Sequence, residues 1–174
     1  MRAVLFLCAA ALALSGCGLR PLYGGGSGGT VQSLLASVQV APIEGQSGWL
    51  VSNALRDRLG AGDTSARYRL EIQLDDSIAG LGVRRDDSVA RERRTLRARY
   101  QLVDLANGAV VLDATAGSDA GIDVVGSEYA TIAAERTALE RLSGIVADQI
   151  VARVARYAQS PATGVAAPTG AAGQ

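Results

Sequence analysis

Several residue types on which protein chemistry commonly depends are missing from this sequence. Histidine is absent from all 174 residues, which removes the commonest general base and the commonest nitrogen ligand of metal ions. Lysine is absent too, so all 17 basic residues are arginine. A nucleophilic serine would therefore lack both histidine and lysine as an activating base. We accordingly expect that the protein is not an enzyme and carries no metal or other cofactor.

The sequence also has few cysteines and no net charge. Of the two cysteines, Cys8 lies in an N-terminal segment that we expect to be removed, so the mature chain would keep Cys17 alone. A single cysteine forms no intramolecular disulfide and no thiolate metal site. Basic and acidic residues balance at 17 each, which argues against nucleic acid as a partner.

What the chain does have at its start is the layout of a lipoprotein signal. Met1-Arg2 is followed by an almost unbroken apolar stretch from Ala3 to Leu14, shorter than the about 20 residues that a membrane span needs. The stretch ends in Leu14-Ser15-Gly16-Cys17, which resembles a bacterial lipobox. That resemblance implies removal of residues 1–16 as a signal peptide and attachment of fatty acids such as palmitate to Cys17. The alternative is a chance cysteine at the end of an ordinary signal or of an N-terminal helix.

The remainder divides into a linker, one domain and a tail. Residues 17–32 include the run Gly24-Gly25-Gly26-Ser27-Gly28-Gly29, which is typical of a flexible leash behind an acylated N-terminus. Residues 33–158 are long enough for one domain with a hydrophobic core. Residues 159–174 are low in large apolar side chains, so we expect a disordered tail.

Hydropathy patterns within 33–158 switch between the periods of strands and helices. The expected elements are a strand at 33–40, a helix at 47–59, strands at 68–85, 89–105 and 109–116, and a helix at 128–158. The long helix has an apolar stripe from Ile132 through Leu142 to Val154, and Trp49 is expected to anchor the first helix in the core. We therefore predict an α+β fold, a β-α-β-β-β-α two-layer sandwich with two helices packed on one face of a four-stranded, mostly antiparallel sheet.

The third and fourth strands raise a question of register. Asn107-Gly108 between them is the strongest hairpin signal in the chain. A two-residue turn there, followed by an unbroken ladder of paired residues, would set Leu102 opposite Asp113. A core residue would then pair with a solvent-exposed one. We therefore predict a bulge near Leu102-Val103 or a loop of more than two residues.

One constellation of charge stands out, on the third strand. Four arginines share one face of this strand: Arg91, Arg93, Arg97 and Arg99. Like charges side by side repel, so a solvated sheet face normally mixes signs. Two interpretations remain open. Either neighbouring strands neutralise the arginines through Glu71, Asp75 and Asp113, or the uncovered face binds anionic groups from outside, which arginine suits through bidentate geometry.

Three segments together resemble a known family. They are CGLRPLYG after the lipobox, AGLGVRRDDSVARERRTLRARYQLVDLANGAVV, and EYATIAAERTALERLSGIVADQI. In this order they look like the LPS-assembly lipoprotein (LptE) family of alphaproteobacteria, over residues 17–157. The resemblance implies a non-enzymatic lipoprotein that plugs the outer-membrane β-barrel of the lipopolysaccharide (LPS) translocon (LptD), assists its assembly and contacts LPS.

The resemblance also implies a location. Gly18 is not the aspartate that retains lipoproteins at the inner membrane, so we expect an outer-membrane protein, lipid-anchored on the periplasmic side. No motif specifies the residues that contact LPS, and the four arginines are the candidates. An auxiliary lipoprotein of an envelope lipid-trafficking ABC transporter is the alternative, because it shares the lipobox, the size and the α+β character.

Overall fold

The structure is a computed structural model that describes residues 29–60, 66–83, 89–124 and 126–160. Its elements in chain order are α2 (Thr30–Ala36), β1 (Val38–Val40), α3 (Gly45–Leu59), β2 (Tyr68–Val83), β3 (Val89–Asp104), β4 (Val110–Asp123) and α4 (Glu128–Gln159). The expected signal peptide, Cys17, the glycine-rich leash and the tail after Ser160 lie outside the described residues.

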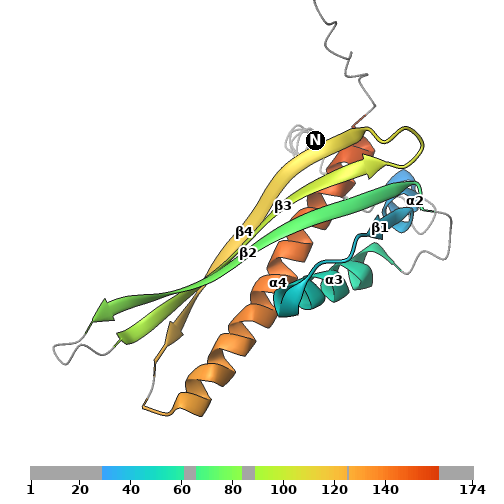
Figure 1. Cartoon of the computed structure of the whole chain (residues 1–174). Helices are drawn as coiled ribbons and strands as arrows, with labels where there is room; N and C mark the ends of the chain where they lie inside the picture. Colours follow the sequence, from blue (N-terminus) through green and yellow to red (C-terminus); the bar gives the residue numbers. More distant parts are fainter. Residues whose placement is uncertain (1–28, 61–65, 84–88, 125, 161–174) are drawn as a thin grey trace, which may run out of the picture.

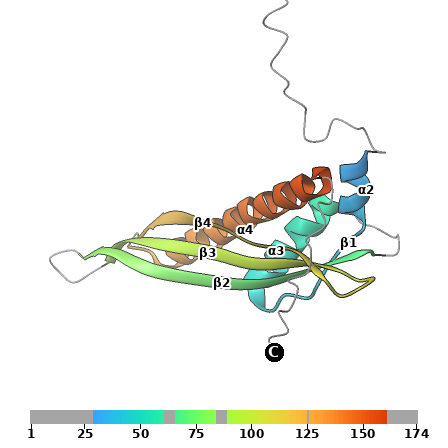
Figure 2. The same ribbon diagram turned by 90° about the horizontal axis from the view of Figure 1, so that it is seen from above.

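The strands form one mixed sheet in the order β1-β2-β3-β4 (Figure 1). Short β1 runs parallel to β2, whereas β2, β3 and β4 are antiparallel to their neighbours. Figure 2 shows the long helix α4 lying along one side of these strands. The predicted α+β architecture, with helices against one face of a mostly antiparallel sheet, is therefore confirmed.

The core lies between α3, α4 and the sheet. From α4 the buried side chains include Leu142, Val146, Ile150 and Val154, and from β3 they include Leu96, Ala98, Tyr100 and Leu102. Their spacing explains the elements, because three or four residues separate neighbours on one face of a helix and two separate neighbours on one face of a strand. The predicted stripe of α4 begins too early, since Ile132 is 47% exposed.

Two expectations at the N-terminal side are wrong. The strand expected at 33–40 is the helix α2 followed by the three-residue strand β1, so the domain has a third helix. Leu35 is buried and Leu34 half-buried, and this side of α2 packs against α4. Adjacent leucines on one packed side fit a helix better than a strand, whose neighbouring side chains point to opposite faces.

Trp49 is the second correction, because it is 63% exposed rather than a core anchor. The buried contact at this end of α3 is made by Gly48 instead. A Cβ atom at Gly48 would lie 2.6 Å from the carbonyl oxygen of Ile43, so only glycine allows the helix to approach that segment. Gly48 and Val51 are turned inward, and Trp49, the residue after Gly48, faces solvent.

The hairpin between β3 and β4 has both features that the sequence offered as alternatives. Leu102 lies opposite Leu112 and Val103 opposite Val110, so Val111 is an extra residue at a bulge. The loop is longer than two residues, since the N–H of Gly108 donates to the carbonyl of Asp104 at 2.8 Å. Gly108 has a φ of 71°, the left-handed conformation that favours glycine.

Candidate functional site

The candidate site is the sheet face opposite the helices, which we call the outer face. Alternate residues of β2, β3 and β4 point to it, as the register between the strands shows. Its charged members are Arg69, Glu71 and Asp75 on β2, Arg91, Arg93, Arg97 and Arg99 on β3, and Asp113, Asp119 and Asp123 on β4. Five arginines thus face five carboxylates, so the described outer face is rich in charge but carries no net charge.

The four candidate arginines do share this face, and three of them have partners on β4. Arg91 pairs with Asp123 at 3.0 Å. Arg97 pairs with Asp119 and Arg99 with Asp113, each at 3.2 Å. These exposed pairs add little to stability and are screened by salt, so an external anion can compete for the guanidinium groups.

Arg93 differs from the other three. It lies opposite Ala79 on β2 and Gly121 on β4, neither of which offers a charge. Within the described residues its exposed guanidinium makes no ion pair. This end of the outer face therefore presents one positive charge between uncharged small residues.

We call the row of Arg91, Arg93, Arg97 and Arg99 on β3 the arginine track. At its other end, hydrogen bonds stabilise the charged forms of Arg99 and Asp113. Gln101 donates to the Asp113 carboxylate at 2.9 Å, and Arg99 donates to the same oxygen at 3.2 Å. Both hydrogen bonds lower the pKa of Asp113 and so hold it ionised. The hydrogen bond to Asp113 is also the main reason that the pKa of Arg99 is raised.

A shallow groove of about 950 Å³ crosses the outer face at Arg97 and Arg99. Its floor at β4 is Gly117, where a Cβ atom would lie 2.5 Å from Cδ of Arg97. The glycine therefore lets the arginine side chain lie across β4 and reach Asp119. At the rim, the Gln149 side chain from α4 accepts from the Gly117 N–H at 3.0 Å and donates to its carbonyl at 3.3 Å.

Two of the carboxylates were not predicted from the sequence. The fourth strand was predicted to end near Ala116, whereas β4 runs on to Asp123 and brings Asp119 and Asp123 beside β3. Of the three acidic residues predicted as partners, Asp113 pairs with Arg99 and Glu71 pairs instead with Arg69 at 2.8 Å. The alternation of apolar and polar residues could have predicted the longer strand. Ala116, Ala120 and Ile122 are buried, whereas the aspartates among them are exposed.

Other kinds of site find no support in the described part of the chain. No three acidic or other potential ligand residues gather there in a way that could hold a metal ion. Among the helices described, none contains a stretch both long and apolar enough to cross a bilayer.

Together these features define a class of protein: a two-layer α+β domain whose sheet leaves one face, lined with arginines and carboxylates, open to other molecules. A comparison with protein families matches residues 35–154 to LptE, described as lipopolysaccharide-assembly. The chain therefore belongs to the LptE family, a non-enzymatic family of envelope lipoproteins that take part in LPS assembly. No curated protein matches the chain.

Solved lipoprotein structures share the fold. A putative lipoprotein from Caulobacter crescentus CB15 is 24% identical with a TM-score of 0.63, and the match covers 76% of this chain and 100% of that one. A minor lipoprotein from Acinetobacter baumannii is 13% identical with a TM-score of 0.54, over 68% and 88% of the two chains. Rare lipoprotein B from Shewanella oneidensis is 14% identical with a TM-score of 0.50, over 68% and 92%. At these identities the likeness concerns the fold alone.

Proposed function

We propose that this protein is the lipoprotein subunit of the outer-membrane LPS translocon. In this proposal acyl chains on Cys17 anchor the protein on the periplasmic side of the outer membrane. The folded domain docks in the LptD-type barrel, assists assembly of that barrel and contacts LPS on its way to the surface. The observation that carries the proposal is the family match, which spans β1 to α4 and so includes the whole outer face.

The outer face supports the LPS contact on physical grounds. Guanidinium groups bind phosphates and carboxylates through paired hydrogen bonds, and successive outward residues of one strand lie roughly 6.7 Å apart. Arg97 and Arg99 can exchange their aspartates for an incoming anion, while Arg93 is available without exchange. Because positive and negative charges balance, the face attracts an anion that fits the arginine track rather than polyanions in general.

The test of the partnership is capture of the tagged, full-length protein from detergent-solubilised membranes of its native host. A barrel whose electrophoretic mobility changes on heating is expected to co-purify. Depletion of the protein should leave that barrel misassembled and reduce LPS at the cell surface. Co-purification of inner-membrane permease components in place of the barrel would overturn the proposal.

The arginine track gives a prediction of its own. Arg97→Gln together with Arg99→Gln is expected to weaken LPS binding by about tenfold at low salt, because two charged hydrogen-bond donors are lost. The difference from wild type should shrink above 0.1 M salt, where charges more than about 10 Å apart are largely screened. Binding is measured by titrating LPS into the purified full chain.

A charge-matched control separates the track from net charge. Arg136→Gln together with Arg141→Gln removes two exposed arginines from α4 and should leave LPS binding within twofold of wild type. Equal losses in both double variants would show that the arginines of β3 act only through overall charge. Both substitutions of the track lie on the surface, so we expect stability to change by less than about 1 kcal/mol.

A further inference from the structure

A second groove, of about 560 Å³, lies on the other side of β4, between this strand and the C-terminal half of α4. Its lining residues are Tyr100, Asp113, Ala114, Thr115, Gln149, Ala152, Arg153 and Arg156. Thr115 and Gln149 also line the groove of the outer face, so the two grooves meet at the β4 edge. Neither the family match nor the arginine track accounts for this second groove.

Two cations face it from one side of the helix. Arg153 and Arg156 are three residues apart, a spacing that places them on the same face of α4. Both are exposed, and within the described residues neither takes part in an ion pair. The Nε–H of Arg156 donates to the Ala152 carbonyl at 3.3 Å, and its terminal N–H groups remain for an anion. The one acidic group in the lining, Asp113, already accepts hydrogen bonds from Gln101 and Arg99 of the outer face. The groove therefore carries an uncompensated charge of about two positive units.

Two further donors converge on the groove. Tyr100 is buried in the sheet, yet its hydroxyl makes no hydrogen bond within the described part of the chain. Tyr100, Arg153 and Arg156 line the same groove. Burial raises the pKa of Tyr100, and the positive charges of the two arginines act against that rise. The phenol therefore stays protonated at neutral pH and can donate.

The second donor is the backbone of Thr115. β4 is an edge of the described sheet, and the Gly117 N–H points away from β3, since it binds Gln149. Outward and inward N–H groups alternate along an antiparallel strand, so the Thr115 N–H also points away from β3. Gln149 satisfies the edge at Gly117, whereas no described residue outside the sheet accepts from the Thr115 N–H, which lies where the groove is.

We propose that this groove is a phosphate-binding site, in which Arg153 and Arg156 hold the anion and the Tyr100 hydroxyl and the Thr115 N–H orient it. A phosphate group offers several acceptor oxygens to these four donors, which is the arrangement that charge-assisted hydrogen bonds favour. The phosphate can belong to a lipid headgroup or to a small soluble ligand. This site does not depend on the translocon partnership, and the experiment below does not involve the barrel.

The test follows amide and guanidinium signals of the ¹⁵N-labelled full chain by NMR. Three probes are titrated separately: inorganic phosphate, LPS micelles and phosphatidylglycerol vesicles, each against chloride at equal ionic strength. Saturable shifts of the Thr115 amide and of the Nε–H groups of Arg153 and Arg156 are expected. Inorganic phosphate producing them identifies a site for free phosphate groups. Shifts with only the lipid probes identify a headgroup site.

Variants decide whether the groove itself is responsible. Arg153→Gln together with Arg156→Gln should raise the dissociation constant at least tenfold, whereas Arg136→Gln with Arg141→Gln should leave it within twofold. Tyr100→Phe keeps the buried ring, removes one donor and should weaken binding about threefold. No saturable shift at Thr115 with any of the three probes would overturn the proposal. Equal weakening in the groove variant and the control variant would overturn it as well.

Discussion

Leu142→Asp is expected to abolish the folded state of the domain. Leu142 has no exposed surface and lies on the face of α4 that packs against the sheet and α3. Losing its side chain from a packed core costs about 2–5 kcal/mol. Burying an unpaired carboxylate there adds several kcal/mol. The sum is comparable to the stability of a typical domain, about 5–15 kcal/mol.

The measurement is circular dichroism of the purified variant at 25 °C, followed through a thermal scan. We expect reduced helical signal and no cooperative transition. Val146→Asp, equally buried and one turn further along α4, should behave in the same way. Ala133→Asp is the control, because it places the same carboxylate on an exposed position of α4 and should unfold cooperatively like wild type. A cooperative transition in Leu142→Asp near that of wild type would mean that the helix stripe is not the core.

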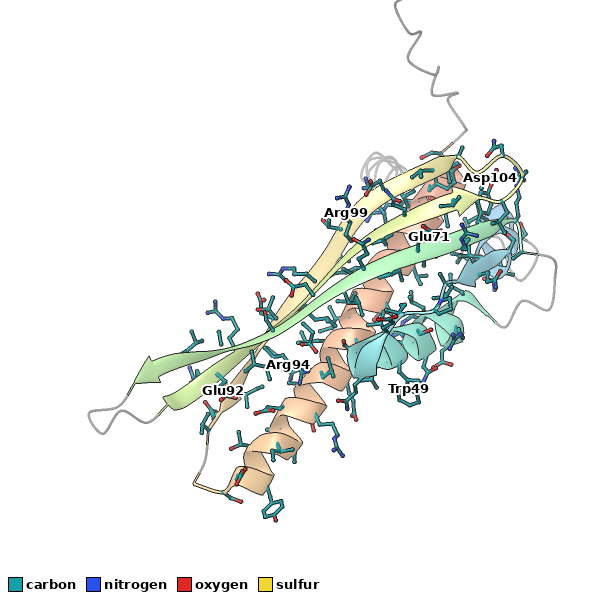
Figure 3. All side chains as sticks on the ribbon, in the orientation of Figure 1. Trp49, Glu71, Glu92, Arg94, Arg99 and Asp104 are labelled. Carbon is teal, nitrogen blue, oxygen red and sulfur yellow. The ribbon has the colours of Figure 1, made fainter. Side chains whose placement is uncertain are left out.

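Arg94→Ala is expected to cause the second largest loss. Arg94 lies on the helix-facing side of β3 and donates to both oxygens of Asp76 on β2, at 2.9 and 2.7 Å. It also donates at 3.1 Å to the carbonyl of Glu135 on α4, and thus joins two strands to the helix (Figure 3). The side chains of Arg94 and Asp76 are only 13% and 18% exposed. Truncating the arginine leaves a largely buried carboxylate without its partner, at a cost of about 2–4 kcal/mol.

The chain provides a matched control on the opposite face of the same strand. Arg91 pairs with Asp123 at 3.0 Å, but these side chains are 64% and 74% exposed. Arg91→Ala should therefore cost less than about 1 kcal/mol. Urea unfolding measures both, and Arg94→Ala should lower the midpoint by about 1 M or more, given the slopes usual for small domains. Equal midpoints for Arg94→Ala and Arg91→Ala would contradict the prediction.

A double variant tests the reason for the loss. If the uncompensated carboxylate causes it, Arg94→Ala with Asp76→Ala should be more stable than Arg94→Ala alone. Glu92 is the complication at this site, because one of its carboxylate oxygens is buried without a hydrogen-bond partner in the described structure. The inner side of the sheet near Arg94 thus holds two carboxylates, Asp76 and Glu92, and among the described residues Arg94 pairs with Asp76 alone.

The parts of the fold that the sequence predicted are those that local periodicity determines. The apolar stripe that includes Leu142 and Val154 predicted α4. The bulge was predicted because an unbroken ladder would have placed a polar residue opposite Leu102. The prediction of a strand at α2 was wrong because apolar residues in so short a window fit the period of a helix as well as that of a strand. Packing of the segment against α4 decides for the helix. The prediction for Trp49 was wrong because being large and apolar does not by itself bury a side chain.

The candidate site shows the same limit. Alternation along β3 placed the four arginines on one face, but the identity of their partners depended on the length of β4. A strand ending near Ala116 would have left Arg91 without Asp123 and Arg97 without Asp119. The groove beside Arg153 could not be predicted at all, since it exists only where α4 packs along the edge of β4.

The Gln149 side chain has a consequence for self-association. At Gly117 its amide accepts and donates the two hydrogen bonds that the strand of a second molecule would otherwise make with the β4 edge. A 14-residue edge strand is an open template for sheet extension, from paired copies to fibrils. With its middle occupied by a helix side chain, the edge offers no continuous ladder to a copy of itself. One glutamine therefore opposes extension of the sheet through β4 where many copies lie close together.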